Sequence, residues 1–462
     1  MSSLSLQVVN SSAALDLQSY FEVLPPKDTI GWLGADADFT VAIAGSDGSG
    51  KPSRLLWVFS DTVMTYYLPE TNQRDISGFS LPMPHNSIAI VDNCTSATDL
   101  AGVYCQGPPR FMSRYPNSFF EVGGNTTDYL WPMSGVSTED GERVLLLACQ
   151  STERQVCNAS ASIRIDNCSA ASPFDWSYVT AKIPYTSMVQ AATSGFSCCG
   201  SISKDPTDPS MVYLLGAISG QTVIARSRLD DLLDGDWSRL EFSRGLDKGW
   251  SPSIAYAAPN NLPVTTETTI TFDGRMGLWY MFLIVNYPTT YKMLIFYSSS
   301  IAATVWKNTT VMESIPEPFN NGSYVCYAAK AHPEYISPTS GDICCDDEER
   351  SVFQLECTWI CNPLDMDMLF SVNSMKQGLR SYWPQFLSVQ VMVETVSPDI
   401  EESTGEKSDN LVMICVMVVA PLLFIVGTLI GWNWYVHLKR KKMMDEKHAP
   451  LSVSLLEDDC VE

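Results

Sequence analysis

The sequence predicts an all-β chain, a five-bladed β-propeller followed by one transmembrane helix. Two observations lead to this fold class. Short apolar runs recur five times before residue 400, and further strand-like runs precede and follow them. A later segment, residues 411–432, carries no charge and is long enough to cross a bilayer.

Composition limits the possible functions. The chain has 462 residues, of which 45% are hydrophobic and 18% charged. That is enough apolar material for a large core, and it excludes a mainly disordered chain. The formal net charge of -23 repels phosphate backbones, so we expect no nucleic-acid partner.

The five core strands are apolar at nearly every position, as expected of strands buried on both faces. Their first residues lie 88, 67, 67 and 77 positions apart. They are residues 56–63 (LWVFSDTV), 144–150 (VLLLACQ), 211–218 (MVYLLGAI), 278–286 (LWYMFLIVN) and 355–362 (LECTWICN).

Each core strand has a strand-like segment before it, and the first four have another after it. The preceding segments are residues 31–43, 130–136, 195–203, 265–272 and 324–335, and the following ones are 87–91, 162–166, 222–228 and 292–298. Trp176, Trp237 and Trp306 then mark a connecting or fourth strand. A radial array of such sheets leaves few exposed edges, whereas a large β-sandwich would explain the strands but not their order.

The charges around the apolar span predict its orientation. Acidic residues precede it, and the basic residues 439–442 follow it, so the C-terminal side should be cytosolic and residues 1–410 extracellular or lumenal. The predicted organisation has five parts: residues 1–27, an N-terminal segment; 28–397, the propeller; 398–410, an acidic linker; 411–432, the transmembrane helix; and 433–462, a cytoplasmic tail. The lipid bilayer is therefore one expected partner.

Glycosylation sequons and cysteines agree with this orientation. Twelve of the 14 cysteines precede the span, which predicts up to six disulfides, and Cys94 and Cys105 are placed to close a short loop. No metal site is expected, because Cys-x-x-Cys is absent and the chain has only four histidines. All seven sequons also precede the span: Asn10, Asn93, Asn125, Asn158, Asn167, Asn308 and Asn321.

The first twenty residues do not fit a secretory protein. They contain no basic start and no apolar run of signal-peptide length. Two alternatives follow: the natural start lies upstream, or the chain is tail-anchored with residues 1–410 in the cytosol. The sequons, the cysteines and the flanking charges favour the first.

Polar residues on the first strands would point into the central channel of a propeller. These positions are candidates for a functional site because they come from separate blades. They are Asp36 and Asp38 in the first blade, Ser134 in the second, Cys198 and Cys199 in the third, Glu267 in the fourth and His332 in the fifth, with Asp61 at the end of the first core strand.

Several motifs resemble a family of uncharacterised five-bladed propellers related to glycoside hydrolases. Residues 31–43 followed by residues 57–62 (WVFSDT) resemble the family's opening, which ends in Trp-x-Phe-Gly-Asp-Thr. Residues 85–89 (HNSIA), 130–135 (LWPMSG) and 327–334 (YAAKAHPE) resemble later steps. The resemblance covers nearly all of residues 28–397, and it implies an arabinanase-, xylosidase- or invertase-like fold with carboxylates on the inner strands.

Glycoside hydrolysis needs a carboxylic acid for the leaving oxygen and a carboxylate as base or nucleophile. We nominate Asp36 as base or nucleophile and Glu267 as acid, the latter with a pKa raised by burial or by a neighbouring carboxylate. Asp38, Asp61, His85 and His332 are the candidate substrate-binding residues.

Other interpretations stay open. Asp36 or Asp38 can form an Asx turn, Asp61 can tie strands together, and His332 can be structural. The acidic residues 346–349 read as a solvated loop or a calcium site, and no other cofactor is expected. The family pattern has aspartate where this chain has Ser134, and a glycine pair where it has Ala35 and Ala37, so the site could be inactive.

Two function classes follow. The first is a membrane-anchored extracellular enzyme, glycoside-hydrolase-like, that acts on or binds carbohydrate. The second is a non-catalytic cell-surface propeller that binds glycan or protein in adhesion or reception. The expected ligand in either case is a carbohydrate or a glycoprotein.

Overall fold

The structure is a computed structural model that describes most of residues 3–396. The described residues are 3–21, 26, 29–46, 51–68, 73–74, 83–96, 103–123, 128–151, 157–184, 196–263, 267–287, 290–317, 319–320, 323–336, 350–363 and 383–396. All of them belong to one compact unit, Met1–Ser397. They are mostly β structure, as the sequence predicts.

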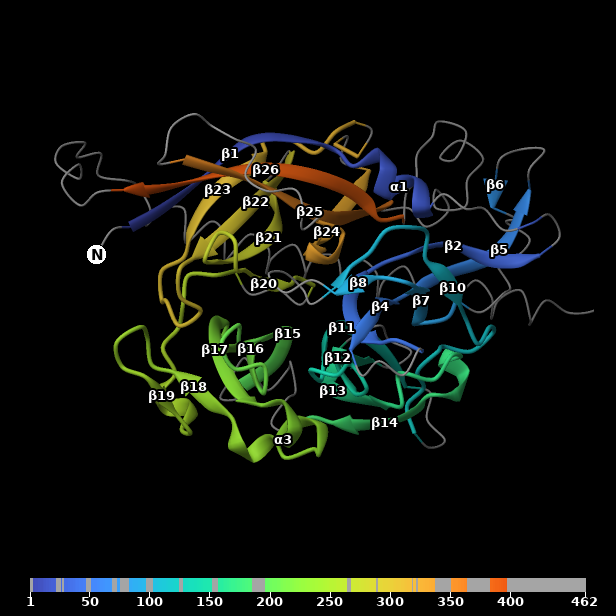
Figure 1. Cartoon of the computed structure of the whole chain (residues 1–462), viewed down its shortest axis with the longest axis horizontal. Helices are drawn as coiled ribbons and strands as arrows, with labels where there is room; N and C mark the ends of the chain where they lie inside the picture. The colour runs from blue at the N-terminus through green and yellow to red at the C-terminus, as the bar shows by residue number, and fades with distance from the viewer. Residues whose placement is uncertain are drawn as a thin grey trace, which may run out of the picture. The chain divides into compact units, whose positions relative to one another are not determined.

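Five antiparallel sheets follow one another in chain order around a centre (Figure 1). The first three contain β3 (Phe39–Ala44), β4 (Pro52–Phe59), β7 (Ser87–Val91) and β10 (Arg110–Met112); β11 (Tyr129–Ser137), β12 (Val144–Ser151), β13 (Cys157–Asp166) and β14 (Ser177–Lys182); and β15 (Phe196–Lys204), β16 (Met211–Ile218), β17 (Gln221–Arg228), β18 (Glu241–Ser243) and β19 (Trp250–Ser251). The last two contain β20 (Ile270–Asp273), β21 (Leu278–Tyr287), β22 (Thr290–Ser298) and β23 (Lys307–Met312); and β24 (Tyr324–Ala331), β25 (Arg350–Pro363), β26 (Gln385–Val396) and β1 (Ser3–Ala13). The five-bladed prediction is confirmed by this strand pairing.

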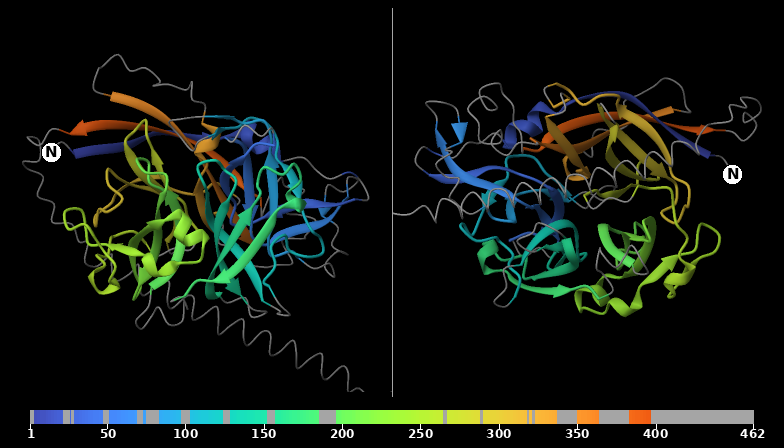
Figure 2. Two further views of the ribbon diagram at one scale, coloured as in Figure 1. Left: turned by 60° about the horizontal axis from the view of Figure 1, so that its bottom comes forward. Right: turned by 180° about the vertical axis from the view of Figure 1, so that it is seen from behind.

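The second strand of each sheet lies in the core between neighbouring blades. All eight residues of β12 are buried, and so are the last six of β4. Their side chains on opposite faces join different core clusters: Leu146 packs with the first blade, whereas Leu145 and Leu147 pack with the third. The predicted burial on both faces is therefore confirmed, and Figure 2 shows the same succession of sheets from two further directions.

Side-chain hydroxyls link the blades around the centre. Ser60 Oγ donates to Pro132 O at 2.8 Å, and Ser134 Oγ accepts from Ile202 N at 3.0 Å. A Ser or Thr hydroxyl also takes part in each of the remaining links around the circle. Ser201 Oγ accepts from Ile270 N, Thr269 Oγ1 accepts from Ala331 N, and Thr40 Oγ1 donates to Glu334 Oε2. These five links join the first blade to the second and finally the fifth blade back to the first.

The predicted N-terminal segment is in part a blade strand. β1 pairs antiparallel with β26 from Ser3 with Val396 to Ala13 with Leu387, so the first strand of the chain is the outer strand of the fifth sheet. Assigning residues 1–27 to a separate segment was therefore wrong. The short helix α1 (Leu15–Phe21) follows β1 and buries Phe21 against Trp57.

The first inner segment also differs from the prediction, because residues 31–43 do not form one strand. β2 (Ile30–Ala35) pairs with β5 (Thr62–Leu68) in a separate sheet that includes β6 (Gln73–Arg74), and β3 alone is the inner strand of the blade. The chain changes direction between β2 and β3, where Ala37 has a φ of 50°. Asp36 and Asp38 lie at this junction.

Some predictions concern residues outside the described part of the chain. They are the linker 398–410, the span 411–432, the tail 433–462, the acidic residues 346–349 and the sequons Asn125 and Asn321. Among the residues that the structure does describe, no helix has the length and apolar character of a membrane span.

Three disulfides are present among the described cysteines: Cys94–Cys105, Cys149–Cys157 and Cys326–Cys361. The predicted Cys94–Cys105 loop is confirmed, and a short two-stranded sheet of β8 (Thr95–Ser96) and β9 (Val103–Tyr104) lies inside it. Cys168 and Cys357 are buried free thiols, so the predicted upper bound of six disulfides is not reached. Four sequon asparagines are exposed: Asn10, Asn93, Asn167 and Asn308.

Candidate functional site

Carboxylates from separate stretches of the chain meet around one lysine at the centre of the sheets. Asp36 and Asp38 come from the β2–β3 junction, and Glu267 precedes β20. All three act electrostatically on Lys330 of β24. We call Asp36, Asp38, Asp61 and Glu267 the acidic centre.

Lys330 is fully buried and bonded to two other blades. Its Nζ donates to Met133 O at 2.8 Å and to Ala37 O at 3.4 Å, and it lies 5.0 Å from the centre of the Phe39 ring. Burial lowers the pKa of Lys330 to about 8, although the neighbouring carboxylates raise it.

Asp36 is half-buried and held by Tyr327 of β24. The Tyr327 hydroxyl donates to Asp36 Oδ2 at 3.0 Å, and Asn362 Nδ2 of β25 donates in turn to the Tyr327 oxygen. Burial, together with the charges of Asp36 and Glu267, raises the pKa of Tyr327 well above its usual value, so this hydroxyl stays a donor. Asp36 is thereby fixed in position by the fifth blade.

Glu267 has the properties expected of a proton donor. Burial raises the pKa of this carboxyl to about 7; Lys330 lowers it, and Asp61 and Asp38 raise it. Both Glu267 and Asp36 act electrostatically on Tyr327 and on Lys330, so the two nominated carboxyls lie near the same two residues.

Asp61 joins the first blade to the second. Its Oδ1 accepts from His85 Nδ1 at 2.8 Å and from Trp131 Nε1 at 2.7 Å. The His85 ring stacks on Tyr129 with 3.5 Å between ring centres. The side chain of His85 remains 32% exposed, so the predicted role in substrate binding is sterically open to it.

Asp38 and His332 do not fit their predicted role as substrate contacts, because both are fully buried. His332 stacks on Trp57 and is bonded at Nδ1 to Thr40 and at Nε2 to Thr358. Burial, with Lys330 nearby, lowers the pKa of His332 to about 3, so it is neutral and structural.

Asp38 lies 3.7 Å from the ring of His332. Burial raises the pKa of Asp38 to about 6, with Lys330 and Thr358 opposing the rise. This buried carboxyl acts electrostatically on Lys330 and on Glu267.

Ser134 is also structural. It is 2% exposed, and its hydroxyl accepts the inter-blade bond from Ile202 N, so this position adds no charge to the centre. The side chains of Cys198 and Cys199 lie outside the described part of the structure.

Sequence reasoning missed Lys330 and Tyr327 as site residues. A signal was present for Lys330, because it is a lone charge in the otherwise uncharged strand Tyr324–Ala331 (YVCYAAKA). A lysine inside a buried strand needs nearby carboxylates, which its neighbours in space supply. Among the described residues, no group of three or more His, Cys, Asp and Glu could hold a metal ion.

The comparisons with known proteins give solved structures only. No family model matches the chain, and no curated protein matches it. An exo-β-1,3-galactanase from Phanerochaete chrysosporium, solved with β-1,3-galactotriose, is 13% identical over 81% of this chain, with a TM-score of 0.36. This chain spans 66% of that galactanase, just under two thirds of its length.

Two further solved structures have similar values. An exo-1,5-α-L-arabinanase from a bovine ruminal metagenomic library is 10% identical, over 80% of this chain and 95% of the other, with a TM-score of 0.35. The catalytic domain of a GH62 α-L-arabinofuranosidase from Coprinopsis cinerea is 11% identical, over 79% and 94%, with a TM-score of 0.38. At such low similarity, the five-bladed fold of this chain rests on its own strand pairing, and its chemistry rests on the residues described above.

Proposed function

We propose that this protein binds carbohydrate at the acidic centre and hydrolyses a glycosidic bond there. One observation carries the proposal: Asp36 and Glu267, from different blades, act on the same lysine and the same tyrosine. Two carboxyls in unlike environments are what this reaction requires.

The two carboxyls suit different roles. With a pKa raised to about 7, Glu267 keeps its proton in mildly acidic solution and can give it to the leaving oxygen. Asp36, oriented by the Tyr327 hydroxyl, is the base or nucleophile. Hydrolysis should therefore fall as the pH rises through about 7, because the acid then loses its proton.

Two partly exposed rings near Asp61, those of His85 and Trp131, offer a surface for a sugar. Tyr129, stacked on His85, also contacts Trp131 edge-on with 5.2 Å between ring centres. Sugar faces pack well on such rings, while His85 offers a hydrogen bond. We assign His85 and Trp131 to substrate binding, with the buried Tyr129 packed against both rings.

The test uses the full chain, first on a glycan array and then in hydrolysis assays on every glycan that binds. Asp36→Asn and Glu267→Gln should each lower kcat by about a hundredfold or more while the fold is kept. Glu356→Gln is the matched control, because Glu356 is also a buried carboxyl with a pKa raised to about 7 but lies on β25, in the wall of a cavity that no residue of the acidic centre lines. Equal loss in all three variants would contradict the assignment.

A non-catalytic receptor is the second candidate. Ser134 contributes no carboxylate where the related pattern has aspartate, and this favours binding without turnover. Glycan binding that is retained in Glu267→Gln, with no product from the unaltered chain, would select this candidate over the enzyme.

We also propose that the protein is anchored in a membrane by residues 411–432, with the propeller extracellular or lumenal. The uncharged span and its flanking charges support this, as do the exposed sequons Asn10, Asn93, Asn167 and Asn308. Removal of N-glycans from the cell-derived protein should lower its mass. A chain without N-glycans would contradict this orientation.

A further inference from the structure

A cavity of about 550 Å³ has walls that include none of the four carboxyls of the acidic centre. Its walls come from the end of β1, from α1, from β9, β25 and β26, and from Tyr335 in the segment after β24. The volume is in the range of small-molecule sites. The residues assigned to the proposed hydrolysis do not line it.

A buried carboxyl lies in the wall of this cavity. Glu356 is 3% exposed, its Oε1 accepts from Gln354 Nε2 at 2.6 Å, and Ser388 also bonds to it. Its Oε2 has no hydrogen-bond partner within the described part of the chain. A buried carboxyl oxygen left in this way costs stability unless something binds to it.

The charged side chains that line the cavity are all acidic. Asp16 of α1 adds a second carboxyl, and none of the described residues that line the cavity is Lys, Arg or His. The protein thus supplies no cation for either carboxyl from within the lining. A ligand with a positive charge would supply it.

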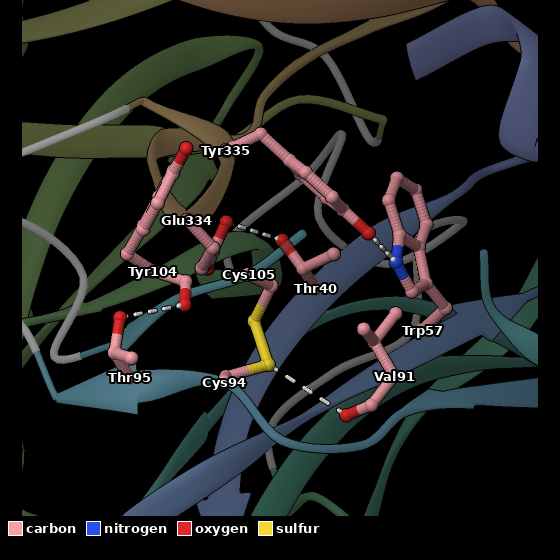
Figure 3. Close-up of a disulfide and its surroundings, with 9 residues drawn as sticks. All are labelled: Thr40, Trp57, Val91, Cys94, Thr95, Tyr104, Cys105, Glu334 and Tyr335. Atoms are coloured by element: carbon pink, nitrogen blue, oxygen red, sulfur yellow. Dashed lines mark hydrogen bonds between the residues drawn. A yellow bond between two sulfur atoms is a disulfide. The ribbon is translucent and has the colours of Figure 1, made fainter. Parts of the chain in front are cut away.

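Tyrosines supply the aromatic part of the surface. Tyr20, Tyr104 and Tyr335 line the cavity from three different elements. Tyr335 is fixed by a bond from Trp57 Nε1 at 2.9 Å, and Tyr104 is next to Cys105 of the Cys94–Cys105 disulfide (Figure 3). Aromatic rings beside carboxylates favour organic cations, whose carbon chains pack on the rings.

From these observations we propose that the cavity is a binding site for a small organic amine. The ammonium group of the ligand bonds to Glu356 and Asp16, and its carbon chain lies along the tyrosines. The site is separate from the acidic centre, and the proposal is independent of the hydrolytic function.

The test is calorimetric titration of the full chain with cadaverine, which carries two amines, and with 1,5-pentanediol, which has hydroxyls in their place. Cadaverine should bind with a Kd of about 1 mM or below, and the diol should not bind. Glu356→Gln should weaken cadaverine binding about tenfold or more, because the charge-assisted bond is lost. Glu267→Gln should bind as the unaltered chain does, because that residue lies at the other site.

Asp16→Asn provides a second variant that does not depend on the folding of Glu356→Gln, since Asp16 is exposed. It should weaken cadaverine binding about threefold. The proposal is overturned if the diol binds as tightly as cadaverine, if neither compound binds, if both Glu356→Gln and Asp16→Asn keep the original Kd, or if Glu267→Gln loses binding.

Discussion

Lys330 explains how so many carboxyls can share the interior at one place. Its ammonium is fully buried, and Asp38, Glu267 and Asp36 all act on it. Its hydrogen bonds go to main-chain oxygens of the first and second blades. The residue therefore compensates buried negative charge and at the same time holds three blades together.

Replacing Lys330 with methionine should lower the free energy of unfolding by about 3–5 kcal/mol at pH 7, where the lysine is still mostly charged, because buried carboxylates lose their cation. The loss should be smaller at pH 5, where Asp38 and Glu267 take up protons. Urea denaturation at both pH values measures this. Lys182→Met, at an exposed position of β14, should change little, and an equal loss at the two pH values would contradict the charge argument.

Sequence reasoning located Asp36 and Glu267, and the structure brings both to one region. It could not tell which polar residues of an inner segment lie below the surface. His332 and Asp38 are fully buried because Trp57, Thr40 and Thr358 enclose them, and these residues come from distant parts of the chain. Burial of this kind depends on tertiary packing, which no local pattern encodes.

At the scale of elements, one turn shows how closely two blades approach. Gly141, in the turn between β11 and β12, has a φ of +73°, and its carbonyl accepts from Ala44 N at 3.0 Å. A Cβ at this position would lie 2.4 Å from the same Ala44 nitrogen. The contact between the first and second blades therefore requires glycine.

Gly141→Ala and Gly220→Ala form a matched pair. Gly220 has a similar φ of +76°, but a Cβ there would meet nothing within 4 Å. Gly220→Ala should cost about 1 kcal/mol from backbone strain alone. Gly141→Ala should cost about 1–3 kcal/mol more, because the blades must also move apart. Equal losses in urea denaturation would show that the close approach is unimportant.

The strand β1 is the outer strand of the fifth sheet, and its buried side chains should stabilise the fold. Leu6 is 3% exposed in the core cluster of the fourth and fifth blades, whereas Val9 on the same strand is 54% exposed. Leu6→Ala should cost about 2–5 kcal/mol. Val9→Ala should stay within about 0.5 kcal/mol. If thermal unfolding is equal in the two variants, β1 does not stabilise the fold.

The core strands were predictable because burial on both faces leaves a run of apolar residues. The third strands agree as well: residues 87–91 form β7 as predicted. The pairing of β1 with β26 was not predictable, because the two strands are far apart in the sequence and nothing in residues 3–13 identifies the partner. The split of residues 31–43 into β2 and β3 was missed for a similar reason, since each half pairs with a different strand.

For the molecule as a whole, four buried carboxyls have a higher pKa in the folded state than in the unfolded state. Burial raises the pKa of Asp38 from 3.8 to about 6, and those of Glu267, Glu334 and Glu356 from 4.5 to about 7. The folded state therefore binds more protons than the unfolded state between about pH 4.5 and 7. By linkage, this contribution to stability is present at the acidic end and is lost as the pH rises.

His332 acts in the opposite direction, because its lowered pKa makes the neutral form the folded one. Its contribution is complete above pH 6.5 and is lost as the pH falls towards 3. One histidine does not offset four carboxyls, so the free energy of unfolding should be higher at pH 5 than at pH 7.5, by about 2 kcal/mol or more. Urea midpoints at the two values measure this, and Glu334→Gln should reduce the difference. A higher midpoint at pH 7.5 would contradict it.

The pairing of β1 with β26 also constrains how the chain is made. Synthesis starts at the N-terminus, so β1 leaves the ribosome long before residues 385–396 exist. At roughly 5–20 residues per second the delay is roughly 20–75 seconds. During that interval the first strand has an open edge and apolar side chains in need of protection. Completion of the ring therefore waits until residues 385–396 have left the ribosome, and the other four blades can form before the fifth is closed.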